Sequence, residues 1–419
     1  LLSLTQRNCA SRSSSFLSAQ VSCGRPREAL RIFRIFQDSK KCVSSSVAAA
    51  AAIVGSKISK PESTRFKMTK GMKARWSKVE GLSSTSESGP GVRSSHGMSA
   101  VEGKGEGNHN EVWVVGGEAK AREPAGMDVF CLKVGEGEGE GEEKNSQATW
   151  SRYPASEEPG KAPEPRNAHG QAAIGDCIYV FGGRKGIQLE ESVLSDLWRF
   201  NTSSKTWEEV DCIGELPECR SYHSACSCGG KLYVFGGCGV EGRLKDLWVF
   251  TPETKAWKRL PDPPGIAGRG GPTLERIEET QTLILFAGFV GEETKDFLTY
   301  DIGSEEWTVH QPSAAIEPRS VCQSFTLGSV TVCYGGEIAP SERGHEGAGG
   351  FSSEILAISS EEIKQIGAVG GSQQPPPRGW GAACTLSSKS GVIFGGLTGT
   401  DENPTRLDDV WVLTLEEEE

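Results

Sequence analysis

The sequence predicts an all-β fold in which six similar units, each of four short strands, close into a ring. The first observation is a pair of small residues that ends an apolar strand, at Gly116-Gly117, Gly182-Gly183, Gly236-Gly237, Ala287-Gly288, Gly335-Gly336 and Gly395-Gly396. The second is an arginine ahead of each pair, at Arg93, Arg166, Arg220, Arg269, Arg319 and Arg378. The third is a following strand that opens on an acidic residue, at Asp128, Asp196, Asp246, Asp296, Glu354 and Asp409. Repeats with one internal order predict a six-bladed β-propeller.

Residues 220–260 show the repeated unit most clearly. Strand-like runs at 231–235, 246–250 and 256–260 alternate with turn residues, and Ser221–Cys228 supplies a fourth. Alternating apolar and polar residues between such turns are typical of short antiparallel strands. One such unit cannot bury its own faces, so neighbouring units have to cover them.

The last strand of the sixth unit is missing from its place in the order. A tryptophan marks this strand in four units, at Trp150, Trp207, Trp257 and Trp307. The segment Ala74–Val79 has the same pattern around Trp76 and no unit of its own. We predict that a strand near residues 74–80 completes the last blade and covers two exposed sheet edges. The predicted propeller then spans residues 68–415, with residues 416–419 as an acidic tail.

Residues 1–67 differ in composition from the rest of the chain. They hold 12 of the 45 Lys and Arg residues, only three acidic residues, and much serine and alanine. This composition resembles an organelle transit peptide. Two other interpretations stay open, a disordered extension and a start of translation at Met68 or Met72. We expect a cytoplasmic protein, or a plastid protein if residues 1–67 act as a transit peptide.

The charge of the predicted ring limits its partners. Outside residues 1–67 the chain has 33 basic and 53 acidic residues, which argues against nucleic acid and anionic membranes as partners. The 13 cysteines form no short framework, and we expect reduced thiols.

The repeated arginines are the first candidate binding residues. In-register positions of a propeller converge on one mouth of its channel, and guanidinium groups there could bind a sulfate or a carboxylate. Three of them precede a histidine by three residues, at His96, His169 and His223. We interpret these histidines as buried strand residues in preference to metal ligands.

A long loop after the fifth pair is the second candidate. Residues 337–349 are glycine-rich and exceed the length that a turn needs, and such loops are functional or disordered. Glu337, Glu342 and His345 give carboxylates and an imidazole, a set that can hold Fe(II) with open positions. The alternative is a solvated loop.

The repeat resembles the kelch family, whose blades carry a glycine doublet followed by spaced aromatic residues, from about Arg75 to Leu415. More specific segments are similar to the specifier proteins of plant glucosinolate breakdown, at residues 220–224, 233–248, 268–272, 288–293, 344–349 and 378–380. The resemblance implies that the aglycone released by myrosinase, a thiohydroximate-O-sulfate, is diverted to a nitrile.

The same resemblance implies roles for single residues. The family holds a non-haem Fe(II) with the motif E-x3-D-x3-H, which Glu337 and His345 match, whereas Ser341 stands at the aspartate position and Glu342 follows it. Further residues resemble those that contact the substrate, namely Arg93 and Arg166 at its sulfate and Trp380 as a channel-lining aromatic. The alternative function is a kelch scaffold that binds a protein partner and carries out no chemistry.

Overall fold

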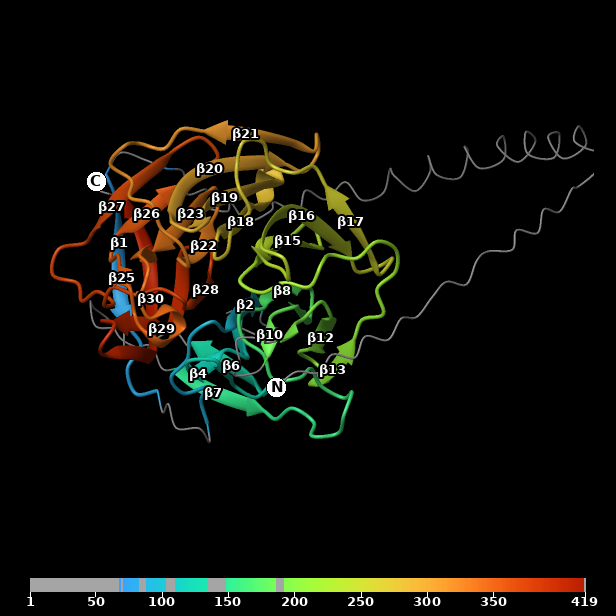
Figure 1. The fold of residues 1–419 in the computed structure, drawn as a ribbon. Coiled ribbons are helices and arrows are strands. Elements are labelled where there is room, and N and C mark those ends of the chain that lie inside the picture. Colours follow the sequence, from blue (N-terminus) through green and yellow to red (C-terminus); the bar gives the residue numbers. More distant parts are fainter. Residues whose placement is uncertain are drawn as a thin grey trace, which may run out of the picture. The chain divides into compact units, whose positions relative to one another are not determined.

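The computed structural model describes residues 68, 71–82, 88–102, 110–134, 148–185 and 192–417, which belong to one unit spanning Ser63–Glu419. The extension predicted at residues 1–67 lies outside the described residues. The described strands form a β-propeller, in which the colours of Figure 1 follow the chain once around a centre.

Four of the blades are separate antiparallel sheets of four strands. In chain order these strands are β2 (Gly97–Val101), β3 (Glu111–Val115), β6 (Val129–Val134) and β7 (Ala148–Tyr153); β8 (Gly170–Ile174), β9 (Cys177–Phe181), β12 (Leu197–Asn201) and β13 (Thr206–Glu209); β14 (Ser224–Cys228), β15 (Lys231–Cys238), β16 (Arg243–Thr251) and β17 (Ala256–Leu260); and β18 (Thr273–Ile277), β19 (Thr282–Phe289), β20 (Glu293–Asp301) and β21 (Glu306–His310).

The remaining strands form one eight-stranded sheet with two four-stranded halves. The strands are β22 (Gln323–Leu327), β23 (Val330–Tyr334), β26 (Ile355–Ile358) and β27 (Ile363–Ala368), followed by β1 (Met72–Lys78), β30 (Pro404–Glu417), β29 (Ser390–Gly399) and β28 (Ala382–Thr385). The halves meet where β1 pairs with β27 in parallel at two positions. Together with the four separate sheets, the described strands therefore supply six four-stranded units.

The N-terminal strand β1 completes the last unit, as predicted. It pairs with β30 in antiparallel register from Met72↔Glu417 to Lys78↔Trp411, and Figure 1 shows it in blue among the red C-terminal strands. Its Trp76 is 3% exposed and meets the ring of Tyr334 edge to face at 4.9 Å. Glu416 and Glu417 of the predicted acidic tail continue β30, and Glu416 forms a 2.5 Å ion pair with Arg75, whereas residues 418–419 lie outside the described residues.

The hydrophobic core lies between neighbouring blades. Its clusters join residues of neighbouring blades; one of them contains both Phe235 of β15 and Leu285 of β19. The innermost strands β2, β8, β14, β18, β22 and β28 contact one another around the whole circle. Each blade face is thus buried by its neighbour, which is the reason a single unit cannot be stable alone.

Two closed circles of backbone hydrogen bonds join the blades at one end of these inner strands. In the first, the second residue of each small pair donates to the carbonyl of the arginine in the next blade, as Gly183 does to Arg220 at 2.9 Å. A Cβ on Gly182 would lie 2.7 Å from that same carbonyl oxygen. This close approach favours glycine at the first position of the pair, although the fourth pair places Ala287 there with a φ of 63°.

The second circle passes through the residue two positions after each arginine. Its members are Ser95, Ala168, Tyr222, Gly271, Val321 and Trp380, and each donates its N–H to the carbonyl of the preceding member at 2.7–3.1 Å. All six have a positive φ, between 49° and 60°. We call these six residues the collar.

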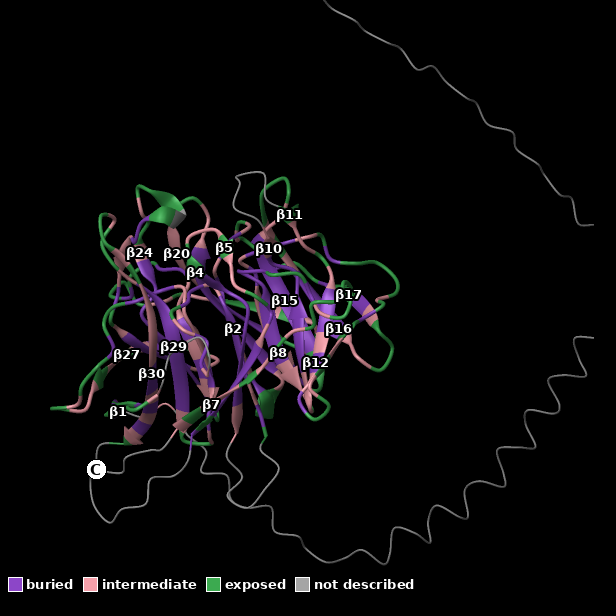
Figure 2. Ribbon diagram, turned by 90° about the horizontal axis from the view of Figure 1, so that it is seen from below, coloured by how far each residue is buried: buried purple, intermediate pink, exposed green. Residues whose placement is uncertain are grey.

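Short hairpins and longer strand ends extend from the blades beyond the collar. The hairpins are β4 (Glu118–Lys120) with β5 (Glu123–Pro124), β10 (Arg184–Lys185) with β11 (Ser192–Val193), and β24 (Glu337–Ala339) with β25 (Gly350–Phe351). Figure 2 places β5, β10, β11 and β24 at one end of the propeller, which we call the mouth. Two 3-10 helices complete the described elements, η2 (Glu278–Thr280) and η3 (Gly344–Glu346). In the described residues no helix is long and apolar enough to cross a membrane, and the cysteines there are free thiols.

Candidate functional site

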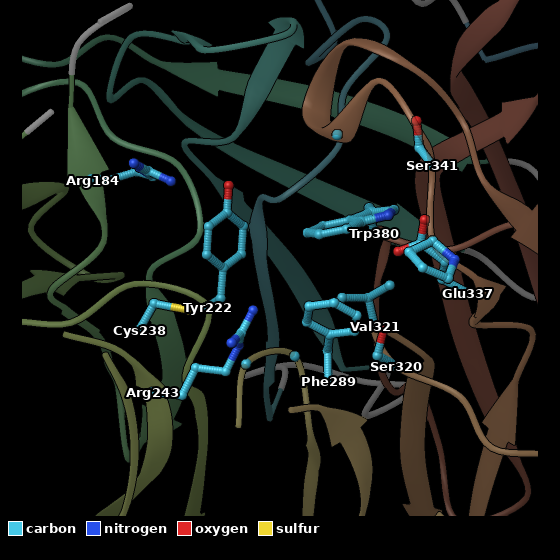
Figure 3. Close-up of a pocket in the computed structure, with 14 residues that line it drawn as sticks. Arg184, Tyr222, Cys238, Arg243, Phe289, Ser320, Val321, Glu337, Ser341 and Trp380 are labelled. Atoms are coloured by element: carbon cyan, nitrogen blue, oxygen red, sulfur yellow. The ribbon is translucent and has the colours of Figure 1, made fainter. Parts of the chain in front are cut away.

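A cavity of about 270 Å³ opens at the mouth, directly above the collar (Figure 3). Its walls come from two in-register positions of the repeat. The collar contributes Tyr222, Gly271, Val321 and Trp380, and the position after each small pair contributes Arg184, Cys238, Phe289 and Glu337. The remaining lining residues are Arg243, Gly270, Ser320, Pro340, Ser341 and Gly344.

One wall of the cavity is basic. Arg184 begins β10, and its guanidinium lies 5.7 Å from the ring centre of Tyr222. Arg243 begins β16, and its guanidinium lies 4.7 Å from the ring centre of Phe289. In Figure 3 both arginines lie on the same side of the cavity. Aromatic faces hold such cations in place without neutralising them, so this wall can receive an anion.

The opposite wall carries a buried carboxyl group. Glu337 of β24 is 7% exposed, and its backbone pairs with that of Ser320 in both directions at 2.9 Å. Burial, together with the charges of Glu293 and Asp401, raises the pKa of Glu337 to about 7, while hydrogen bonds from the Ser341 backbone and the Trp380 side chain act in the opposite direction. This group therefore changes its charge near neutral pH, so the cavity offers an anion site facing a carboxyl group that can be neutral.

Aromatic rings form the floor between the two walls. Tyr222 and Trp380 of the collar meet edge to face at 5.5 Å, and Figure 3 shows both rings between the arginines and Glu337. The left-handed backbone at these positions is rare for large residues, and the circle of collar hydrogen bonds holds it. A ligand with an anionic end and an apolar body suits this combination of walls and floor.

Arg93 and Arg166, predicted to contact a substrate sulfate, are not among the residues that line this cavity. Arg166 is fully buried within its blade, where it donates to both oxygens of Asp196 at 2.7 and 2.8 Å and to the carbonyl of Gly182. Arg93 donates to the carbonyl of Gly116 at 2.8 Å and also to that of Pro90. These contacts do not support the predicted role, because both groups are engaged in holding the blades.

The same buried contact recurs around the ring. Each later arginine pairs with an acidic residue within or directly before the third strand of its blade, as in Arg220–Asp246, Arg269–Asp296, Arg319–Glu354 and Arg378–Asp409. Three of the acidic residues also accept from a tryptophan two positions on, such as Trp248 from its Nε1 to Asp246 at 2.6 Å. The repeated arginine and acidic residue are therefore one structural motif.

The other predicted residues lie at or near the cavity with different contacts. Trp380, Glu337 and Ser341 line it. Glu342 is exposed. The backbone of His345 belongs to η3, and its side chain is outside the described part of the structure. Sequence reasoning missed Arg184 and Arg243. Arg184 directly follows a glycine pair, a position that is visible in the repeat, whereas Arg243 has no such signal.

The described side chains do not fit the Fe(II) site that the resemblance implies. Among them no group of three His, Cys, Asp or Glu residues is arranged to hold a metal ion. The hydroxyl of Ser341 does not face Glu337 as a ligand would, since it donates to Asp401 at 2.5 Å. We therefore derive no chemical step through iron.

The three histidines lie below the collar around a smaller cavity of about 120 Å³. Each packs toward the neighbouring blade, and the Nε2 of His223 accepts from the backbone of Gly170 at 3.0 Å. Burial and the charge of Arg166 lower the pKa of His169 to about 3, although the nearby side chain of Gln171 opposes them. The three histidines are buried, as expected, but each directly precedes an inner strand (β2, β8 or β14) and does not lie within it.

This chain is similar to a family model, to several known proteins and to a solved structure. The model of the KLHDC2/KLHL20/DRC7 Kelch-repeats domain matches residues 95–336. An N-(sulfonatooxy)prop-2-enimidothioate sulfolyase of Thlaspi arvense is 27% identical over 376 residues, which cover 83% of this chain and 99% of that protein. A structure titled YjhT matches 79% of this chain and 99% of its own with a TM-score of 0.58 at 17% identity, which shows a shared fold.

Other relatives contain the repeat as one part of a larger protein. The Adagio-like protein 3 of rice, Oryza sativa subsp. japonica, is 29% identical over 70% of this chain and 45% of its own length. A leucine-zipper-like transcriptional regulator 1 homolog of Drosophila melanogaster is 29% identical over 48% of this chain and 21% of its own length. The sulfolyase, in contrast, is matched along nearly its whole length.

Proposed function

This chain belongs to the kelch-repeat family, and from that premise we propose that it is a specifier-like lyase acting on a small sulfonatooxy imidothioate in the mouth cavity. The substrate would be the aglycone that the thioglucosidase myrosinase releases, and the product a nitrile. The observation that carries the proposal is the pair Arg184 and Arg243 on one wall of the cavity. The relation to the Thlaspi sulfolyase, which extends over 83% of the chain, supports it.

The charges of the cavity suit such a dianion. The sulfate group would lie at Arg184 and Arg243, because guanidinium groups bind oxyanions through two parallel hydrogen bonds. The apolar side chain of the substrate would lie on Tyr222 and Trp380. Glu337 can remain protonated opposite the arginines, which avoids repulsion of the thiolate.

The N–O bond breaks and its electron pair leaves with sulfate, while the C–S bonding pair becomes the second π bond of the nitrile. The sulfur is left with six valence electrons and passes to a thiolate co-reactant, whose lone pair binds it to form a persulfide. Negative charge grows on the departing sulfate, and fixed positive groups at that point lower the barrier. Arg184 and Arg243 would thus stabilise the leaving group, and the enclosed cavity would hold the carbon chain away from competing rearrangement.

The test is a product assay with aglycone generated in place by myrosinase from a thioglucoside. Wild type should raise the ratio of nitrile to isothiocyanate, and the double variant R184A/R243A should lower that ratio at least about tenfold. R259A is a matched control, since Arg259 is a surface arginine paired with Asp262. The assay is run with added Fe(II) and with a chelator, so that a need for iron is visible.

A wild-type protein that leaves the product ratio unchanged under both conditions would overturn the proposal. That outcome would favour the alternative function, a kelch scaffold that presents its mouth loops to a protein partner. A ratio that R184A/R243A does not alter would reject the assigned anion site even if the activity is present.

A further inference from the structure

The loop that follows β24 is tied to a different blade at the place where the family motif has its aspartate. This loop, residues 340–347, forms one edge of the mouth cavity through Pro340, Ser341 and Gly344. Asp401 reaches it from the turn between β29 and β30, 60 residues further along the chain. We call the contacts between Asp401 and residues 341–343 the latch.

Both oxygens of the Asp401 carboxylate are used in the latch. The hydroxyl of Ser341 donates to Oδ1 at 2.5 Å, and the backbone N–H of Glu342 donates to Oδ2 at 3.0 Å. The side chain of Arg343 adds a third link, from Nη1 to the carbonyl of Asp401 at 2.7 Å. Asp401 thus bonds three consecutive residues, two through its carboxylate and one through its backbone carbonyl, which fixes both the position and the direction of the loop.

The hydroxyl of Ser341 is also fully engaged. While it donates to Asp401, it accepts a hydrogen bond of 3.0 Å from the backbone N–H of Arg343. The chain leaves room for this arrangement at Gly347, where a Cβ would lie 2.3 Å from both the Ser341 hydroxyl and Oδ1 of Asp401. A side chain at position 347 would therefore push the two groups apart.

We infer that the latch holds this wall of the cavity in place of a bound metal, so that the loop is ordered without iron. In the motif E-x3-D-x3-H an aspartate at position 341 would turn a negative charge toward a metal. A second carboxylate there would face Asp401 and repel it, whereas serine supplies the donor that Asp401 needs. Serine at position 341 and aspartate at position 401 thus form one complementary pair. The inference does not depend on the proposed activity, because it concerns the loop itself.

Two measurements test this inference on the whole chain. In anaerobic titration with Fe(II), wild type should retain less than about 0.1 iron per chain after desalting, and neither Fe(II) nor a chelator should shift its melting temperature. Limited trypsin digestion reports on the loop, because Arg343 lies inside it. D401N weakens the acceptor and S341A removes the donor, and each should raise cleavage after Arg343 at least about tenfold.

E402Q is the matched control. Glu402 neighbours Asp401 and accepts from the Thr400 hydroxyl at 2.9 Å. It acts on Arg343 of the loop through its charge and not through a described hydrogen bond, so E402Q should raise cleavage far less than D401N. Stoichiometric iron that raises the melting temperature of wild type, and that E337Q abolishes, would overturn the inference. Equal cleavage of D401N and wild type would overturn it as well. Either result leaves the arginine wall, and the product assay that tests it, untouched.

Discussion

The chain contains two kinds of arginine that differ in what surrounds the guanidinium. The repeated arginines, such as Arg166 and Arg220, are fully buried and pair with a carboxylate of their own blade. Arg184 and Arg243 lie at the mouth and stack on aromatic rings beside a cavity. The repeat thus builds the scaffold from positions that are the same in each blade, and the site from positions that differ between blades.

Blade one shows what happens when the scaffold motif changes. Its acidic residue, Asp128, accepts from Arg152 at 2.6 Å and from the backbone of Ala155. Within the described residues Arg93 bonds backbone carbonyls and forms no ion pair. Burial lowers the pKa of Arg93 to about 10, although the charge of Asp128 opposes the shift. A buried arginine without a close carboxylate should contribute less to stability than the others.

The largest effect should follow from Arg220→Ala. The variant leaves Asp246 without its cation in a partly buried place, and removing one partner of such a pair costs about 3–5 kcal/mol. Urea unfolding followed by fluorescence measures the loss, and Arg93→Ala should lose clearly less. Equal losses for the two variants would contradict the distinction between blade one and the others.

Arg243→Ala should affect binding and leave the scaffold intact. Its side chain is exposed, so the free energy of unfolding should change by less than about 0.5 kcal/mol. The affinity for a stable aryl sulfate, measured by quenching of tryptophan fluorescence, should fall about tenfold, or about 1.4 kcal/mol. Unchanged affinity would place the anion elsewhere and remove the contrast between the two kinds of arginine.

The buried histidines should make stability depend on pH. His169 stays neutral in the folded chain down to about pH 3, whereas in the unfolded chain it binds a proton below about pH 6.5. Folding stability from this group is therefore complete above pH 6.5 and decreases as the pH falls, by about 1.4 kcal/mol per unit. The carboxyl group of Glu337, whose pKa is raised, acts in the opposite direction.

Comparing His169→Gln with wild type separates the pH-dependent stability that His169 contributes from that of Glu337, which both proteins share. On going from pH 6 to pH 4, the free energy of unfolding should fall more in wild type than in the variant. Chemical unfolding at several pH values measures it. A difference that does not vary with pH would mean that His169 is protonated in the folded state.

The smallest effect tests the collar. Ala168 has a φ of +51°, a conformation that costs a non-glycine residue about 1–2 kcal/mol. Ala168→Gly removes this cost but gives the unfolded chain more freedom, which leaves a net gain of about 0.5 kcal/mol. Ala172→Gly in β8 relieves no strain, gives the unfolded chain the same added freedom and removes a buried methyl group, so it should destabilise. If the two substitutions shift the thermal midpoint in the same direction, the collar is not strained.

Much of the scaffold could be predicted from the sequence because the same residue pattern occurs in six copies. The glycine pairs, the strands that follow them and the closing strand around Trp76 all lie where the pattern put them. The direction of the repeated arginines could not be predicted. Their spacing shows that they share one position, but whether that position faces the channel or the inside of the blade depends on the path of the backbone.

The candidate site was only partly visible in the sequence. Trp380 and Glu337 could be proposed from the resemblance, and Arg184 follows a glycine pair directly. Asp401 could not be linked to Ser341, because the two are 60 residues apart and meet through loops of different blades. Contacts of this kind depend on the relative orientation of loops in two blades. Local sequence patterns do not encode that orientation.

The pairing of β1 with β30 has a consequence for the order in which the protein can be made. The first strand of the ring is synthesised well before its partner, since Arg75 and Glu416 are separated by 341 residues. At about 5–20 residues per second, β1 waits on the order of tens of seconds for the strand that covers its edge. During this time the edge of β1 that β30 covers is open, and the pairing of β30 with β1 is the step that closes the ring.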